Sequence, residues 1–389
     1  MKVLLNGLRW AYPLLPVKTK STKGVGQFKM TKFSVFTMLC VLSACIVCSQ
    51  TSAADSHAVV DAQLRTNQQK HGIPGQAVLV LHNNDILYRN ASGTTALGDG
   101  VPVTPNTVFP VYSVSKLFAI TLAMQLHEEG KLDIAAPASR YVENLPHSWR
   151  NIRIDQFLNH VSGIPEYFDS NNFSRPFPPS LAAVFANLKD LPLLSAPGER
   201  TRYTNTNNLV IAAVLESVTQ TSYRTLLRQR IIEPLELNET WLDLADVPKD
   251  RLVESYRAKG GQIVPDLSIA WPDYSAAHVG AFMTLDDAGK FMSAVAQGHL
   301  VSKSELLRLW QPYQFANGTV GFFAAGWDYG ESSRWREVGH DGGTKVRVRI
   351  LFDDNLDNHY VIVYLTNGNN DGVWSSTLVN SVQNLILPK

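Results

Sequence analysis

Ser113-Val114-Ser115-Lys116 is the most informative stretch of this 389-residue chain. It begins an apolar helical pattern that runs to Gly130, and it is the only Ser-x-x-Lys in the sequence. Residues three apart lie on one face of a helix, so the Lys116 amine can reach the Ser113 hydroxyl. A serine beside a base becomes a good nucleophile. Since chance supplies about one such match in a chain of this length, the prediction depends on further motifs downstream of Lys116.

A loop from Pro197 to Asn205 precedes an apolar helix that we expect to start near Leu209. In an extended loop, Tyr203 and Asn205 point the same way. A phenol beside a lysine ammonium can lose its proton more easily than in water. An amide can hold both the lysine and a substrate carbonyl. The loop therefore adds a candidate acid–base group and a candidate orienting group.

A third segment, Val338-Gly339-His340-Asp341-Gly342-Gly343, is expected to enter an edge strand through its glycines. Glycine lets a backbone N–H approach a substrate closely. Ser113, at a helix N-terminus, would have N–H groups that favour a developing oxyanion. Each short motif is weak alone, because Tyr-x-Asn recurs at 88–90 and His-x-Gly at 278–280. Their order along the chain makes the set informative.

The ordered set Ser113-x-x-Lys116, Tyr203-x-Asn205 and His340-x-Gly342 resembles the serine beta-lactamase and penicillin-binding-protein superfamily. The resemblance covers about 60–386. It includes 159–165, which looks like the family's SHTSGLP loop, 232–240, which looks like its PLGM…T segment, and 282–287, which looks like its STAxDL helix start. The branch most similar to this chain is the class C-like group of esterases, D-amino-acid peptidases and DD-carboxypeptidases.

The resemblance implies an α/β (α+β) fold, in which an antiparallel sheet built from both chain ends is flanked by helices and an all-helical domain is inserted. Strand patterns at 76–81, 86–88, 346–352 and 359–366 and helical patterns at 56–71 and 373–386 agree with this expectation. The hydrolase domain would span 55–389, with the α/β part at about 55–130 and 320–389 and the helical part at about 131–319. The site would lie in a cleft between the two parts.

The resemblance also implies a role for each site residue. Ser113 would be the acylated nucleophile, and Lys116 and Tyr203 would share the proton transfers, with the identity of the base left open. Asn205 would orient the lysine and the substrate amide, and His340 would replace the lysine of the family's Lys-Thr-Gly motif. Asp341 and Gly342 would add substrate contacts, and the backbone N–H groups of Ser113 and Gly343 would form the oxyanion hole.

Two departures from the family pattern bear on the substrate. His340 replaces a lysine, and Asp341 stands where threonine is usual in enzymes that bind a substrate carboxylate. A free acid there would repel a carboxylate by on the order of 1 kcal/mol or more in a partly dry cleft. That argues against beta-lactams and D-Ala-D-Ala ends and permits esters, or peptides whose amine pairs with Asp341. Arg347 or Arg349 would restore anion binding, but we expect strand alternation to turn one of them away.

The first 54 residues differ in composition from the rest. They carry seven basic residues and no acidic one. Because the whole chain has a net charge of +1, residues 55–389 have a net charge of −6, and this mildly acidic balance does not suggest a nucleic-acid partner. An apolar run from Phe33 and small residues up to Ala54 predict a secretory signal at 30–54, after a start at Met1 or Met30. The predicted location is a bacterial periplasm or the medium, with a membrane tether only if Cys45 in a lipobox-like sequence is lipidated.

All three cysteines precede residue 55, so a mature chain needs no disulfide, and neither a metal nor another cofactor is expected. We therefore expect an exported serine hydrolase that forms an acyl-enzyme on Ser113 and acts on a small ester or a D-amino-acid peptide. The alternatives are a D-alanyl-D-alanine carboxypeptidase or a true beta-lactamase, and a catalytically silent relative that binds peptides or cell wall. The oligomeric state is left open.

Overall fold

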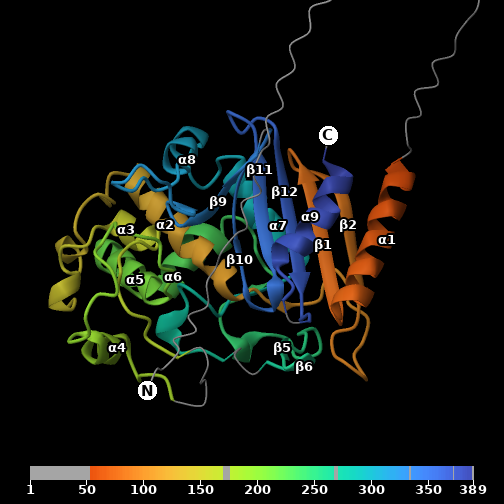
Figure 1. Cartoon of the computed structure of the whole chain (residues 1–389), viewed down its shortest axis with the longest axis horizontal. Coiled ribbons are helices and arrows are strands. Elements are labelled where there is room, and N and C mark those ends of the chain that lie inside the picture. The colour runs from red at the N-terminus through yellow and green to blue at the C-terminus, as the bar shows by residue number, and fades with distance from the viewer. Residues whose placement is uncertain (1–52, 170–175, 267–269, 333, 371, 388–389) are drawn as a thin grey trace, which may run out of the picture. The chain divides into compact units, whose positions relative to one another are not determined.

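The structure is a computed structural model that describes residues 53–169, 176–266, 270–332, 334–370 and 372–387. Within these residues the main feature is a seven-stranded antiparallel sheet in the order β2-β1-β12-β11-β10-β9-β8 (Figure 1). Its strands come from both ends of the chain: β1 (Gly75–His82), β2 (Asp85–Gly93), β8 (Phe323–Ala324), β9 (Trp327–Glu331), β10 (Arg336–Asp341), β11 (Arg347–Phe352) and β12 (His359–Thr366). The expected antiparallel sheet with flanking helices is confirmed.

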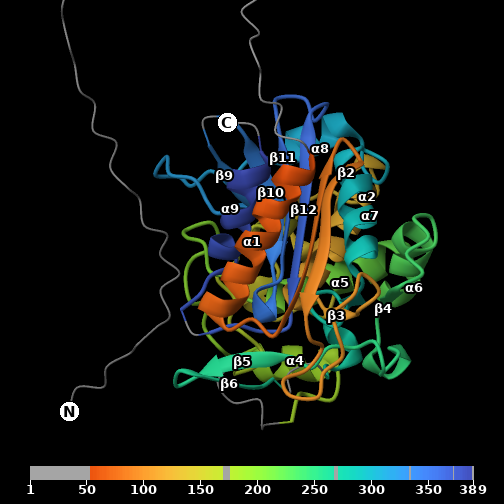
Figure 2. The same cartoon turned by 90° about the vertical axis from the view of Figure 1, so that its right-hand side faces the viewer.

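Both faces of the sheet are buried, which explains why β1 reads as a continuous apolar run. Leu79 packs into the larger core on one face, and Val78 and Val80 pack on the other. Helices α1 (Ala53–His71) and α9 (Ser375–Ile386) cover the second face, while α7 (Leu285–Ala296) covers the first, so α1 and α7 lie on opposite sides of the sheet (Figure 2). A Cβ at Gly289 of α7 would lie 2.3 Å from a terminal methyl of Leu79, so a larger residue there would force the Leu79 side chain to move.

Further helices lie beside the sheet, where α2 and α5 pack together in the larger core: α2 (Lys116–Glu128), α3 (Ile154–Leu158), α4 (Leu181–Leu188), α5 (Thr206–Thr219), α6 (Tyr223–Leu227) and α8 (Lys303–Leu309). The range 131–319 is less purely helical than expected. It contributes α7 to the sheet layer. It also holds β4 (Thr240–Trp241) and β7 (Phe282–Met283), which pair with β3 (Phe109–Pro110), and the hairpin of β5 (Tyr256–Lys259) and β6 (Gln262–Pro265).

The segment 338–343 does not enter an edge strand. Residues 336–341 are themselves β10, which lies inside the sheet between β9 and β11. The glycines at 342 and 343 lie between β10 and β11, so the segment does precede a strand, but neither strand is at the edge of the sheet. The expectation missed that the segment has itself the period of two that a strand needs, with Val338 and His340 on one face and Gly339 and Asp341 on the other. The register with β9 ends at Gly339, so His340 lies at the end of the strand.

The predicted signal segment lies outside the described residues, except for Ala53 and Ala54, which begin α1. Both candidate starts and all three cysteines also lie outside them. Of the helices that are described, none combines the length and the apolar character needed to cross a bilayer.

Candidate active site

Ser113 lies in a single 3-10 turn, Tyr112–Ser115, that leads directly into α2. Two hydrogen bonds to Ala281 hold the ends of the turn in place: Val111 N–H donates to the carbonyl oxygen of Ala281 (3.0 Å), and the Ser115 hydroxyl accepts from Ala281 N–H (3.2 Å). Tyr112 has a left-handed φ of +47°, which is uncommon for a residue with a side chain. The hydroxyl of Ser113 is therefore presented from a constrained turn at the start of a buried helix.

Lys116 is fully buried and has three acceptors. Its Nζ lies 2.9 Å from Ser113 Oγ, 2.8 Å from Asn205 Oδ1 and 3.1 Å from the carbonyl oxygen of His278. Burial lowers the pKa of Lys116 to about 7, although the carboxylates of Glu166 and Asp328 act in the opposite direction. Near neutral pH, a large fraction of this amine is uncharged and able to accept a proton.

Tyr203 completes the surroundings of the nucleophile. Its hydroxyl donates to Ser113 Oγ at 3.0 Å, and its ring lies over Lys116 Nζ (5.1 Å) and stacks on His160 (4.4 Å between ring centres). Although 38% of the residue is exposed, desolvation raises the pKa of Tyr203. The expected easier loss of its proton is therefore contradicted, because desolvation outweighs the hydrogen bond to Ser113. Tyr203 is placed as a neutral proton donor.

Asn205 immediately precedes α5 and faces Lys116 through its Oδ1. Tyr203 and Asn205 do point to the same place, since one reaches Ser113 and the other Lys116. The loop is not extended as far as Asn205, however, because Asn205 already has helical φ and ψ angles (−70° and −24°). Behind Asn205 lies Glu166, whose Oε2 accepts from both the backbone N–H and the side-chain Nδ2 of Asn205. Sequence reasoning missed Glu166, whose only local signal is its place directly after the 159–165 loop.

His340 is buried, and its ring centre lies 6.0 Å from that of Tyr203. Its Nδ1 lies 2.6 Å from the carbonyl oxygen of Asp341. A carbonyl can only accept, so Nδ1 carries the proton and Nε2 is left with a lone pair. Burial lowers the pKa of His340, and the charge of Lys116 adds to this effect, while Asp328 opposes it. The histidine is therefore neutral where the family's lysine would be cationic.

Asp341 does not present a free acid to the site. Its carboxylate accepts from Arg347 and Arg349 (both 2.8 Å) and from the hydroxyl of Ser375. Burial acts to raise the pKa of Asp341, but the two guanidinium groups outweigh it and lower the pKa to about 2. We expected Asp341 to repel a substrate carboxylate or to pair with a substrate amine. Both expectations were wrong, because they required an Asp341 charge that no neighbouring cation compensates.

The expectation for the two arginines was also wrong. Arg347 and Arg349 are two residues apart on β11, so strand alternation places them on the same face of the sheet, and both reach Asp341. That face is opposite to the one that carries His340. Neither arginine is therefore a ready-made partner for an anionic substrate.

The glycines after β10 lie against the turn that carries the nucleophile. A Cβ at Gly342 would lie 2.4 Å from the carbonyl oxygen of Val111, and one at Gly343 would lie 2.9 Å from the Tyr112 ring. Only residues without a side chain permit this approach. Gly343 thus lies next to the turn that carries Ser113, as expected. The role of the two N–H groups as an oxyanion hole stays a prediction.

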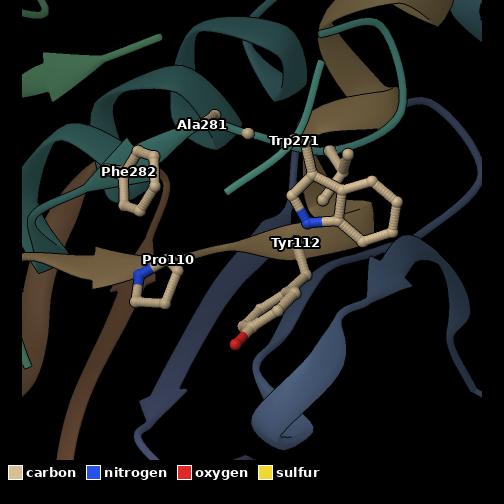
Figure 3. A pocket seen from close by; sticks show the side chains of 7 residues that line it. Pro110, Tyr112, Trp271, Ala281 and Phe282 are labelled. Atoms are coloured by element: carbon tan, nitrogen blue, oxygen red, sulfur yellow. The ribbon is translucent and has the colours of Figure 1, made fainter. Parts of the chain in front are cut away.

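A small hollow adjoins the nucleophile turn. Figure 3 shows the indole of Trp271 beside the phenol of Tyr112, with Pro110, Ala281 and Phe282 completing a largely apolar wall. A larger cavity of about 300 Å³ shares Trp271 and Phe282 with it and adds polar groups at Arg224 and Asp243. Elsewhere in the described part of the chain, no group of three or more His, Cys, Asp or Glu side chains is arranged to hold a metal ion.

The sequence profile described as Beta-lactamase matches residues 60–375. The chain belongs to the beta-lactamase family. This family consists of serine hydrolases such as amidases, carboxypeptidases and beta-lactamases. Among curated proteins, a penicillin-binding protein of Bacillus subtilis (strain 168) is 24% identical over 342 residues, which cover 82% of this chain and 73% of that protein.

Two solved structures show the shared fold of this family member. The D-amino acid amidase from Ochrobactrum anthropi SV3, complexed with D-phenylalanine, has a TM-score of 0.71 at 19% identity, covering 85% of this chain and 99% of that one. The octameric penicillin-binding protein homologue from Pyrococcus abyssi has a TM-score of 0.70 at 21% identity, covering 84% and 76%. At such identities the likeness establishes the fold and leaves the substrate open.

The lowered pKa of Lys116 predicts the pH dependence of this hydrolase. The amine is protonated below about pH 7 and neutral above it, so kcat/KM for an ester should rise as the pH increases through about 7. Burial is the largest cause that lowers the pKa values of His160, His278 and His340 from their usual value, so these histidines titrate below the step expected for Lys116. The measurement is kcat/KM between about pH 5 and pH 9, corrected for spontaneous hydrolysis. A flat profile would contradict the assignment.

Proposed function

We propose that this protein is an exported serine hydrolase that forms an acyl-enzyme on Ser113 and hydrolyses small esters or amides, including those of D-amino acids. The observation that carries the proposal is the position of Ser113 Oγ, 2.9 Å from Lys116 Nζ and 3.0 Å from the Tyr203 hydroxyl. One neighbour can take the serine proton, and the other can return a proton to the leaving group.

In the acylation step, neutral Lys116 removes the proton from Ser113 as Oγ attacks the substrate carbonyl carbon. The carbonyl oxygen becomes an oxyanion, which the N–H groups of Ser113 and Gly343 would stabilise. As the carbonyl re-forms, the bond to the leaving group breaks. The leaving group takes a proton from Tyr203, which recovers it from Lys116. Water then attacks the acyl-enzyme, and its proton passes to Lys116. As the bond between Ser113 Oγ and the acyl carbon breaks, Lys116 returns that proton to Ser113, so the acid is released and both Ser113 and neutral Lys116 are regenerated.

The charges around the site favour substrates without a carboxylate next to the reacting bond. His340 is neutral, and Arg347 and Arg349 already bind Asp341. The apolar hollow beside Tyr112 (Figure 3), at about 10 Å³, has room for no more than a water molecule. The adjoining cavity of about 300 Å³, which Trp271 and Phe282 also line, has the volume for a small substrate group. The preference for esters and uncharged amides thus rests on the neutral histidine and not on repulsion by Asp341.

A D-alanyl-D-alanine carboxypeptidase or a true beta-lactamase is the second candidate, because the Bacillus relative that covers most of the chain is a penicillin-binding protein. Substrates of both types carry a carboxylate, which a cationic lysine would bind better than neutral His340. A silent relative that binds peptides or cell wall is a third candidate. It has less support, because both proton-transfer groups are within hydrogen-bond distance of the nucleophile.

The test combines labelling with a substrate panel. An active-site fluorophosphonate should modify Ser113, as located by mass spectrometry of the digested protein. Short p-nitrophenyl esters and a D-aminoacyl amide should give a kcat/KM at least about tenfold higher than a chromogenic cephalosporin or a D-Ala-D-Ala peptide. Modification of another serine would exclude the proposed nucleophile. A preference for the two carboxylate substrates would move the function to the second candidate.

Export is proposed from the order of residues in the N-terminal segment. A basic stretch, an apolar run and small residues follow one another before residue 55, as in secretory signals. The same order would place the enzyme in a bacterial periplasm or in the medium, with lipidation of Cys45 as the route to a membrane tether.

A further inference from the structure

Glu166, in the loop after α3, directs its carboxylate at the start of α5. Oε2 accepts from the backbone N–H of Asn205 (2.8 Å) and from its Nδ2 (3.0 Å), while Oε1 accepts from the N–H of Tyr167 (3.0 Å) and the hydroxyl of Thr206 (3.3 Å). Four donors surround two oxygens. Burial raises the pKa of Glu166, while the hydrogen bonds from Asn205 and Tyr167 and the charge of Lys116 act in the opposite direction. A protonated carboxyl would turn its own O–H against one of the four donors, so the contacts favour the carboxylate.

These contacts fix which end of the Asn205 amide faces the base. Because Nδ2 is held by Glu166, Oδ1 is the end that lies 2.8 Å from Lys116 Nζ. A flipped amide would put its oxygen against the Glu166 carboxylate, which is a repulsive contact between two acceptors, and would remove the acceptor oxygen from the lysine. Glu166 therefore determines an orientation that Asn205 alone does not.

We propose that Glu166 is a positioning residue for the hydrolytic reaction, which holds the Asn205 amide so that its oxygen directs the Lys116 amine at Ser113. It does not touch the nucleophile. The inference rests on the proposed function, in which Lys116 activates Ser113. It adds a residue that lies one contact beyond the motif side chains and that no motif position identifies.

The charge of Glu166 acts in the same network. The titratable groups that face Lys116 are Glu166, Asp328 of β9, the Tyr203 phenol and three neutral histidines (His160, His278, His340). Burial lowers the pKa of Lys116, and the Glu166 carboxylate raises it. Loss of the carboxylate should therefore lower the pKa of the base further. A side chain with a purely structural role would have no such effect.

The test is Glu166→Gln, which keeps the size of the side chain and removes its charge. We expect kcat for a p-nitrophenyl ester to fall by about 10- to 100-fold, because the base is less well aimed, with KM changed little. The acid limb of the kcat/KM profile should move to lower pH, because the ammonium form of Lys116 loses a stabilising charge. Glu166→Asp keeps the charge, so its acid limb should stay closer to that of the wild type.

Asp287→Asn is the matched control. Asp287 is a buried carboxylate that accepts from Glu239 N–H and the Thr240 hydroxyl, at the start of α7 and outside the site. This variant should lose stability in thermal unfolding while its pH profile stays that of the wild type. It thus separates the loss of a buried carboxylate from the loss of this one.

Three results would overturn the inference: wild-type kcat and pH profile in Glu166→Gln, a lower kcat with an unmoved acid limb, or the same shift in Asp287→Asn. If Glu166→Gln does not fold, Glu166→Asp decides, since a lower kcat with a nearly unchanged acid limb supports the role and full wild-type kcat refutes it. Failure of the proposed function looks different, because a Ser113→Ala protein would then remain active whatever occupies position 166.

Discussion

A Ser113→Ala protein is expected to lose at least about four orders of magnitude in kcat/KM toward an activated ester. The substitution deletes the oxygen that both Lys116 and Tyr203 contact, and without a nucleophile no acyl-enzyme can form. Enzymes that act through a serine retain only the catalysis due to binding and oxyanion stabilisation when the serine is removed. The measurement is p-nitrophenyl acetate hydrolysis at about pH 8, where Lys116 is largely neutral.

Ser293→Ala provides a control for this experiment. Ser293 is a buried serine of α7 whose hydroxyl donates to Asn84 Oδ1 (2.8 Å), remote from the motif residues. Its loss should lower stability by about 1 kcal/mol and leave kcat/KM near the wild-type value. Hydrolysis by the Ser113→Ala protein at the wild-type rate, with thermal unfolding unchanged, would remove Ser113 from the mechanism.

The sheet could be predicted because its strands are long and buried on both faces. β1 and β12 read as largely apolar stretches bounded by turns, and β11 is strand-like although it carries Arg347 and Arg349. The structure places each within a residue or two of the expected range. The sheet of β3, β7 and β4 could not be predicted. Each of its strands has two residues, too few to show any period, and they are joined only by the tertiary fold. The hairpin at 256–265 was missed despite a usable signal, the Gly260-Gly261 pair between two short strands.

The motif side chains could be predicted because each sits at a fixed offset from the start or the end of a helix or strand. Ser113 and Lys116 share one helix start, and Tyr203 and Asn205 share the short segment that leads into α5. What their surroundings do to them could not be read from the sequence. Desolvation of Tyr203 raises a pKa that was expected to fall. The pairing of Asp341 with Arg347 could have been found, because a turn of five residues between two antiparallel strands places them opposite each other.

Two contributors to the site carry no motif signal. Glu166 acts through a contact across 39 residues of sequence, and His278 contributes its backbone carbonyl, not its ring. His278 even belongs to the second His-x-Gly of the chain, a pattern too short to be specific. A backbone acceptor has no side-chain signature, so only the fold reveals that the Lys116 amine has a third partner.

The second large effect is expected for Lys116→Met, which should lower kcat by about a thousandfold and remove the rise of activity through about pH 7. Methionine is similar in length and tolerates burial, so the packing at the start of α2 is kept while the base is lost. Asn205 Oδ1 and the His278 carbonyl each lose a donor, and a destabilisation of about 1–3 kcal/mol per group should appear in thermal unfolding.

Comparison with Tyr203→Phe decides which of the two groups is the base. The phenol remains protonated because its pKa is raised, so its removal should cost a proton donor and still leave the pH-dependent limb that belongs to Lys116. If Tyr203→Phe abolished the limb and Lys116→Met preserved it, the roles would have to be exchanged. The buried amine of Lys116, with Asn205 and His278 also accepting from it, would then serve to hold a tyrosinate next to Ser113. We expect the pH-dependent limb to survive in Tyr203→Phe and to be lost in Lys116→Met. Burial lowers the pKa of Lys116 and raises that of Tyr203, which leaves the lysine able to accept a proton and the tyrosine able only to donate one.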